Sequence, residues 1–179
     1  MNISQTGGHI DHLLRQTRVH HVQLSSMADV KANMMITLSS LVITFSVRYL
    51  SDPYLRWPVI IMLLFCFFTI LAAAYAVMPK LDYRYRPNLK NPDCNVLFFG
   101  SFMNLTYPEF AGILEEVIND PARTYEAQVR EVYELGVFLG YKKYRYIRLA
   151  YLLFLTGLFV SGLVLIVVEF FNFSHVLAG

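Results

Sequence analysis

The sequence has few charges, few cysteines and no motif of a familiar catalytic site. Only 16% of its 179 residues are charged whereas 56% are hydrophobic, which is too apolar for an ordinary soluble domain. A net charge of +2 gives no reason to expect a nucleic-acid partner. The two cysteines, Cys66 in an apolar run and Cys94 in a loop, support neither a disulfide framework nor a zinc site. These absences leave a membrane protein as the expected class.

The sequence also lacks the elements that most enzymes need. It contains no nucleophile elbow, phosphate-binding loop or His-rich metal pattern. His9 and His12 are three residues apart on a predicted helix and could share a metal ion, but no third ligand is evident. The predicted membrane spans carry no Asp, Glu, Lys, Arg or His in their interiors, since Arg48 and Glu169 lie near span ends, and this argues against an intramembrane enzyme or transporter. We therefore expect no enzymatic activity, no metal and no cofactor.

Three apolar segments are long enough to cross a bilayer as helices, for which about 20 residues suffice. We expect an all-α membrane protein with three transmembrane helices and a small, mostly helical cytosolic insert between the second and third. The predicted parts are an N-terminal cytosolic helix at residues 1–31, spans at 32–50, 57–78 and 149–171, and the insert at 79–148. All but two of the 15 Lys and Arg residues lie in 1–31 and 80–148, so the positive-inside rule places both segments in the cytosol.

The insert has readable helix signals. Thr106 and Glu109 match a capping box that opens a short helix. Asp120 followed by Pro121 opens a longer one, which we expect to continue from the cytosol into the third span without a break. After Arg148 no charge occurs until Glu169. The apolar residues 95–102 are interpreted as a short strand or a buried extended plug.

Two charges at the entrance of the first span need partners. Asp29 and Lys31 are two residues apart on a helix, so they point to different faces and do not neutralise one another. We expect Asp29 to pair with Lys or Arg of the insert or of the basic and aromatic collar at residues 140–148. For Lys31 we expect an acidic side chain, a lipid phosphate or a bound anion. The alternative is that both are simply interface charges.

Small polar residues form a stripe along the first span. Either they pack against other spans through interhelical hydrogen bonds, or they line a pore or wet seam once several chains assemble. The stripe consists of Asn33, Thr37, Ser40 and Thr44.

A second constellation combines aromatic and basic residues. A planar ligand with a phosphate group needs aromatic faces for stacking and Arg or Lys for its charge. The alternative is that the Phe residues belong to the core and the basic residues only obey the inside rule. The members are Phe98, Phe99, Arg84, Arg86, Arg123, Arg130, Lys142, Lys143 and Arg145. The candidate ligand-binding residues are all of these except Arg84 and Arg86, together with Asp29 and Lys31.

Three stretches together resemble a known family. They are ADVKA at residues 28–32, LFFGSF at 97–102 and REVYELGVFLGYKKYRYIRLAY at 130–151. In this order they resemble the transmembrane effectors of Pycsar, the pyrimidine cyclase system for antiphage resistance, and the likeness covers residues 20–161. The matched motif positions are Asp29, Lys31, Ala32, Phe98, Phe99, Gly100, Lys142, Lys143, Tyr144 and Arg145.

The resemblance implies a cyclic-nucleotide-activated effector that impairs the integrity of the bacterial inner membrane. In that family a cyclase makes cyclic CMP or cyclic UMP on infection, and the effector responds by arresting or killing the infected cell. The implied protein is a multi-pass homo-oligomer with a cytoplasmic N-terminus, cyclic UMP or cyclic CMP as its ligand, and a pore or leak as its output. The alternative is a membrane scaffold or assembly protein whose long cytosolic helix docks a protein partner.

Overall fold

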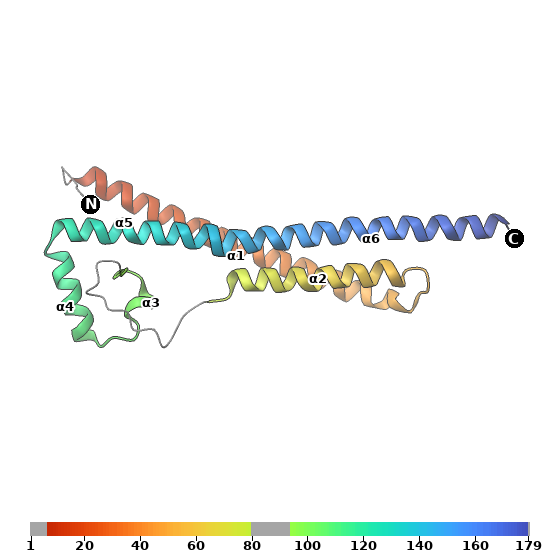
Figure 1. Cartoon of the computed structure of the whole chain (residues 1–179), viewed down its shortest axis with the longest axis horizontal. Coiled ribbons are helices and arrows are strands. Elements are labelled where there is room, and N and C mark those ends of the chain that lie inside the picture. The colour runs from red at the N-terminus through yellow and green to blue at the C-terminus, as the bar shows by residue number, and fades with distance from the viewer. Residues whose placement is uncertain (1–6, 80–93, 179) are drawn as a thin grey trace. The chain divides into compact units, whose positions relative to one another are not determined.

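The computed structural model describes residues 7–79 and 94–178, and all regular elements in these ranges are helices (Figure 1). In chain order they are α1 (Gly8–Ser46), the 3-10 helix η1 (Val47–Ser51), α2 (Arg56–Val77), α3 (Phe99–Phe102), α4 (Tyr107–Ile118), α5 (Pro121–Phe138), the π-helix η2 (Leu139–Tyr144) and α6 (Arg145–Ala178). Three helical stretches are long and apolar enough to cross a membrane: Gly8–Ser51, Arg56–Val77 and Pro121–Asn172. The predicted all-α fold with three such helices is confirmed.

The chain divides into two compact units, each built from two separate stretches of sequence. The first unit comprises residues 1–25 and 79–140, and the second comprises residues 26–78 and 141–179. The first turns of α1 therefore belong to one unit and the rest of the helix to the other. The predicted division into spans and an insert depends on where a bilayer lies, so it stays a prediction.

The second unit is held together by close packing of small side chains. Its helices α2 and α6 lie side by side (Figure 1). A Cβ added at Gly157 of α6 would lie 2.4 Å from the Cβ of Phe65 in α2, so the two helices approach this closely only because residue 157 is glycine. The buried core of the unit consists of Ala28, Ala32, Met35, Ala72, Ala73, Ala76, Ile147 and Ala150.

The connection between α1 and α2 is short. After η1, the carboxylate of Asp52 accepts a hydrogen bond from the backbone N–H of Tyr54 at 2.9 Å, which stabilises the turn. Trp57 is 63% exposed in the single chain, as expected for an aromatic anchor at a membrane interface.

The first unit is built around α4 and α5, which meet at a corner (Figure 1). Glu109 accepts a hydrogen bond from the backbone N–H of Thr106 at 2.8 Å, so the predicted capping box is confirmed. Asp120 accepts from the N–H groups of Ala122 and Arg123 at 2.9 and 3.4 Å, as predicted for the start of the long helix. Both helices therefore begin where local sequence signals place them.

The expectation of a strand or buried plug at residues 95–102 is wrong. The segment forms turns followed by the one-turn helix α3, and Phe98 and Phe99 are 41% and 53% exposed. No described residue is in a strand, so this segment has no described ladder partner. Its backbone groups bond locally instead: the side-chain oxygen of Asn95 accepts from the Leu97 N–H at 3.1 Å, and the Ser101 N–H donates to the Phe98 carbonyl at 2.9 Å.

Residues 121–178 are helical throughout, but the hydrogen-bond pattern changes within them. Between α5 and α6, the segment Leu139–Tyr144 is a π-helix. A π-helical turn is rare and often occurs at functional positions, because tertiary contacts must compensate its poorer geometry. This segment contains the two lysines of the predicted collar.

Candidate functional site

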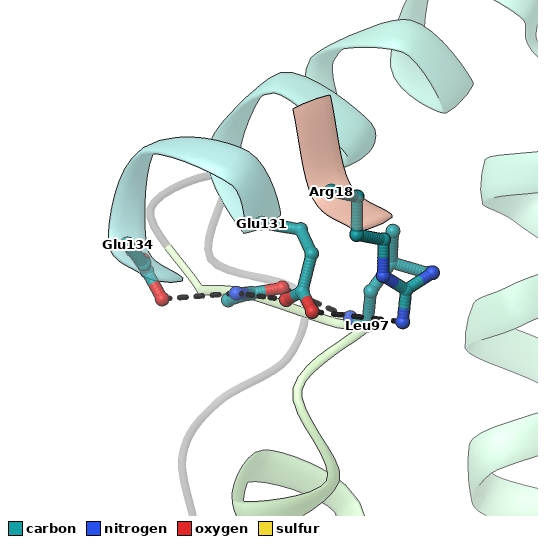
Figure 2. A network of polar contacts seen from close by, with 5 residues as sticks. Arg18, Leu97, Glu131 and Glu134 are labelled. Carbon is teal, nitrogen blue, oxygen red and sulfur yellow. Dashed lines mark hydrogen bonds and ion pairs between the residues drawn. The ribbon is translucent and has the colours of Figure 1, made fainter. Parts of the chain in front are cut away.

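A buried asparagine connects the loop before α3 to helix α5. Asn95 is 5% exposed, and its amide nitrogen donates to Glu131 at 2.8 Å and to Glu134 at 2.9 Å. Figure 2 shows Glu131 and Glu134 on α5 reaching this loop, with Leu97 beside them. Because one amide serves two carboxylates, the loop is fixed on the side of α5 that carries these residues.

Glu131 also faces α1. The Arg18 guanidinium lies 3.7 Å from the second carboxylate oxygen of Glu131 (Figure 2). The side chain of Glu131 is only 13% exposed, whereas that of Arg18 is 55% exposed. The carboxylate is therefore held from two sides, and the guanidinium keeps much of its surface available for a further anion.

A second polar contact joins the same two helices. The hydroxyl of Tyr125 in α5 donates to the carboxylate of Asp11 in α1 at 2.8 Å. This hydrogen bond, together with burial, raises the pKa of Tyr125 above its usual value, because both disfavour the phenolate beside a carboxylate. Tyr125 stays a neutral donor at physiological pH and anchors the first turns of α1.

A half-enclosed cleft of about 410 Å³ lies between the first turns of α1 and α5. Such a volume falls within the roughly 300–1,000 Å³ typical of small-molecule sites. On α1 the lining residues are spaced so that they share one helix face, and on α5 they are spaced likewise. The lining consists of Asp11, Leu14, Arg15, Arg18, Leu97, Gln128, Glu131 and Val132.

The cleft offers binding groups but no nucleophile. Two guanidinium groups, two carboxylates and one amide surround an apolar floor. The nearby Cys94 is half-buried, and burial raises the pKa of its thiol, so little thiolate forms at neutral pH. Among the described residues no group of three or more His, Cys, Asp or Glu side chains is placed to hold a metal ion. The arrangement suits recognition of a small molecule that carries charged, polar and apolar groups.

The second unit contains a short ion pair. The ammonium group of Lys143, in the π-helix, lies 2.6 Å from the Asp29 carboxylate of α1. The side chain of Lys143 is 11% exposed and that of Asp29 is 42% exposed. The prediction that Asp29 pairs with a cation of the collar is confirmed. The pair neutralises the Asp29 carboxylate, which would be costly to leave unpaired at the entrance of the first span.

The family of this chain follows from a comparison over most of its length. Residues 12–168 match the Pycsar effector protein domain, PycTM. The chain belongs to the Pycsar effector family. It is thus an antiphage effector with a transmembrane domain, as the resemblance of the three quoted stretches predicts. No curated protein and no solved structure matches the chain.

The predicted ligand-binding residues of this Pycsar effector are divided between the two units. In the first unit, Arg123 lies 3.4 Å from Glu116, and Arg130 lies 3.9 Å from Glu126, four residues before it on α5. The rings of Phe98 and Phe99 are 4.9 Å apart. The second unit holds Asp29, Lys31, Lys142, Lys143 and Arg145.

The basic residues of the second unit differ in their surroundings. Lys142 and Arg145 are exposed, whereas Lys143 is engaged by Asp29. Lys31 is half-buried and forms no ion pair or side-chain hydrogen bond with another described residue. Arg84 and Arg86, also proposed from the sequence, lie outside the described residues. The roles of all these residues in ligand binding stay predictions.

The polar stripe of the Pycsar effector lies on an exposed face of α1. Its members Asn33, Thr37, Ser40 and Thr44 are all exposed in the single chain, and Thr44 donates to the Ser40 carbonyl at 2.9 Å. Asn33 and Thr37 line a shallow groove of about 480 Å³ with apolar neighbours of the same helix. The face is thus available to a second copy of the chain.

The cleft residues of the first unit were missed in the sequence. Their signal is a helical spacing: Asp11, Arg15 and Arg18 recur on one face of α1, and Gln128 and Glu131 on one face of α5. Such polar faces usually indicate solvent-exposed helix surfaces. Only the packing of α1 and α5 against one another turns these two faces into a cleft.

Proposed function

We propose that the chain is a cyclic-nucleotide-activated membrane effector that impairs the inner membrane of a bacterium during antiphage defence. The observation that carries this proposal is the match to the Pycsar effector domain over residues 12–168. Three helices long and apolar enough to cross a membrane support the membrane as its target. The ligand is cyclic UMP or cyclic CMP.

The proposed orientation places the first unit in the cytoplasm, where a cyclase would release its product. The positive-inside rule supports this orientation, because most Lys and Arg residues lie outside the turn between the first two spans. Arg48 and Arg56 are the exceptions near that turn. A receptor surface on the cytoplasmic side reaches the nucleotide without transport across the membrane.

The proposed active form is a homo-oligomer assembled through α1. The side-chain amide of Asn33 is exposed and has no hydrogen bond to another described residue. In hydrocarbon such a group is costly, and pairing with a second copy relieves the cost; interhelical hydrogen bonds of this kind contribute about 0.6–2 kcal/mol each. A stripe of Asn, Thr and Ser shared between copies would also be the wet surface of a pore or leak.

In this proposal the effector has a closed state and an open state that leaks, and the nucleotide must bind the open state more tightly than the closed one. Shifting an equilibrium from 1:99 to 99:1 requires about 5.5 kcal/mol of differential binding. In an oligomer this demand is divided among the bound copies. A ligand of moderate affinity therefore suffices to switch several subunits together.

Leakage from liposomes tests the proposal. Purified full-length protein is inserted into dye-loaded vesicles, and cyclic CMP, cyclic UMP, cyclic AMP and a cyclic dinucleotide are added one at a time. We expect release with a cyclic pyrimidine mononucleotide. Silence with all four, from folded and inserted protein, would reject ligand-gated leakage and favour the scaffold alternative.

A pair of neighbouring variants tests the role of α1. Asn33→Leu removes the exposed amide, and Met34→Leu changes an adjacent exposed residue without changing polarity. We expect Asn33→Leu to reduce ligand-induced leakage strongly while Met34→Leu responds like the original chain. Equal leakage from both variants would remove the stripe from the mechanism.

A further inference from the structure

We infer that the cleft between the first turns of α1 and helix α5 is the nucleotide-binding site of this effector. The inference rests on the proposed function, since it locates the site that a nucleotide signal needs. All the described residues that line it belong to the first unit, so a single chain supplies them. Its occupant is a cyclic pyrimidine mononucleotide.

The phosphate of the ligand is held by Arg15 and Arg18. These residues are three apart on α1 and both line the cleft. The Arg15 side chain forms no ion pair or hydrogen bond with another described residue, so its guanidinium is ready for an anion. Guanidinium groups bind phosphate oxygens with two parallel hydrogen bonds, and the cyclic monophosphate offers two such oxygens.

Glu131 acts as a positioning residue for Arg18. Its carboxylate is held by the Asn95 amide at 2.8 Å and lies 3.7 Å from the Arg18 guanidinium. The carboxylate therefore limits the orientations of the guanidinium and leaves its outer donors directed to the ligand. Asp11 also lines the cleft, and its carboxylate accepts a hydrogen bond from the Tyr125 hydroxyl at 2.8 Å.

The remaining walls match the ribose and the base. Gln128 carries both a donor and an acceptor, which is what the polar edge of a cytosine or uracil ring requires. Carboxylate oxygens accept from a ribose hydroxyl, and the side chains of Leu14, Leu97 and Val132 provide an apolar surface for the planar ring. The cleft thus offers one group for each part of the nucleotide.

Three other cations of the predicted ligand-binding set already face a carboxylate. Arg123 and Arg130 each have a glutamate within 4 Å on their own or the preceding helix, at 3.4 and 3.9 Å. Lys143 is buried against Asp29 at 2.6 Å. A carboxylate already neutralises each of these three cations, as Glu131 does for Arg18 at 3.7 Å, whereas Arg15 has no ion-pair partner among the described residues, so the assignment of the phosphate rests first on Arg15.

Isothermal titration calorimetry on the full chain in lipid nanodiscs tests the site. Cyclic CMP and cyclic UMP are titrated into the original protein and into Arg15→Ala, Arg15→Lys and Arg56→Ala. Loss of a charged phosphate contact should weaken binding by roughly ten- to a hundredfold in Arg15→Ala. Arg15→Lys should keep part of the affinity, and Arg56→Ala, which removes the same charge from an exposed position of the second unit, should bind normally.

A second variant tests recognition of the base separately from recognition of the phosphate. Gln128→Leu removes the amide that we assign to the pyrimidine edge and adds no charge. We expect it to reduce the difference in affinity between cyclic CMP and cyclic UMP. An unchanged preference, with unchanged affinity, would contradict the assignment of Gln128.

The outcomes distinguish a failure of the proposed binding site from a failure of the proposed function. Normal nucleotide binding by Arg15→Ala, while the original protein both binds and leaks, would overturn the site and leave the proposed function standing. Absence of binding and leakage with the original protein would overturn both. Competition by inorganic phosphate at the same concentration as the nucleotide would show a general anion site and overturn the nucleotide assignment.

Discussion

Replacing Gly157 by alanine should loosen the packing of α2 against α6. A Cβ at this position would lie 2.4 Å from the Cβ and 2.8 Å from the Cγ of Phe65, whereas ordinary contacts begin at 3.4 Å. The nearest atoms belong to the base of the Phe side chain, so a rotamer change does not relieve the clash. The helices must separate by roughly 1 Å, and overpacking of this kind costs about 1–3 kcal/mol.

The same helix provides a matched control. A Cβ at Gly162 meets nothing within 4 Å, so Gly162→Ala makes the same chemical change without a clash. Because alanine is the better helix former by about 0.5–1 kcal/mol, this variant should be as stable as the original chain or slightly more so.

Thermal unfolding in detergent micelles, followed by the fluorescence of the single Trp57, measures the difference. For a chain of this size a loss of about 1–3 kcal/mol corresponds to a fall in Tm of roughly 2–12 °C. We expect this fall for Gly157→Ala and none for Gly162→Ala. Equal Tm values for the two variants would refute the close approach of α2 and α6 at this point.

Three further predictions concern polar groups. Asp29→Asn should lower the free energy of unfolding by about 1–3 kcal/mol, and more than Lys143→Met does, because it removes the negative charge 2.6 Å from a nearly buried ammonium, whereas Lys143→Met removes the positive charge beside a more exposed carboxylate; equal Tm values in detergent would contradict this. Burial raises the pKa of Cys94, so in a Cys66→Ser background its alkylation by iodoacetamide should reach half its maximal rate at a higher pH than a free thiol does. The folded chain holds this proton more tightly than the unfolded one, so the associated stability is full below the ordinary thiol pKa and is lost as pH rises above it. Tyr125→Phe removes the donor to Asp11 and should speed tryptic cleavage in the first turns of α1; unchanged cleavage would show that this hydrogen bond does not anchor them.

Features set by local sequence could be predicted. Thr106 with Glu109, and Asp120 with Pro121, start α4 and α5 because capping involves residues within a few positions of one another. The three long apolar helices follow from composition and length. The partner class of Asp29 was predictable as well, since an entrance charge must be neutralised.

Features that depend on distant residues could not be predicted. Residues 95–102 looked like a strand because their pattern is apolar, but Asn95 bonds to carboxylates 36 and 39 positions away, and this fixes a turn. The π-helix at Leu139–Tyr144 has no clear signal in its composition. The cleft escaped notice because each of its two polar faces alone resembles an ordinary solvated helix surface.

The discontinuous construction of the first unit has a consequence for biosynthesis. The Asp11 and Tyr125 side chains that close one end of its packing are 114 positions apart, with two predicted spans between them. While the ribosome is still making α1 and α2, the opposite wall of the cleft does not yet exist. The cleft therefore forms only after α5 has left the ribosome. Under the function proposed above, a truncated or half-inserted chain would lack its nucleotide site, and unfinished copies of the effector would stay inactive.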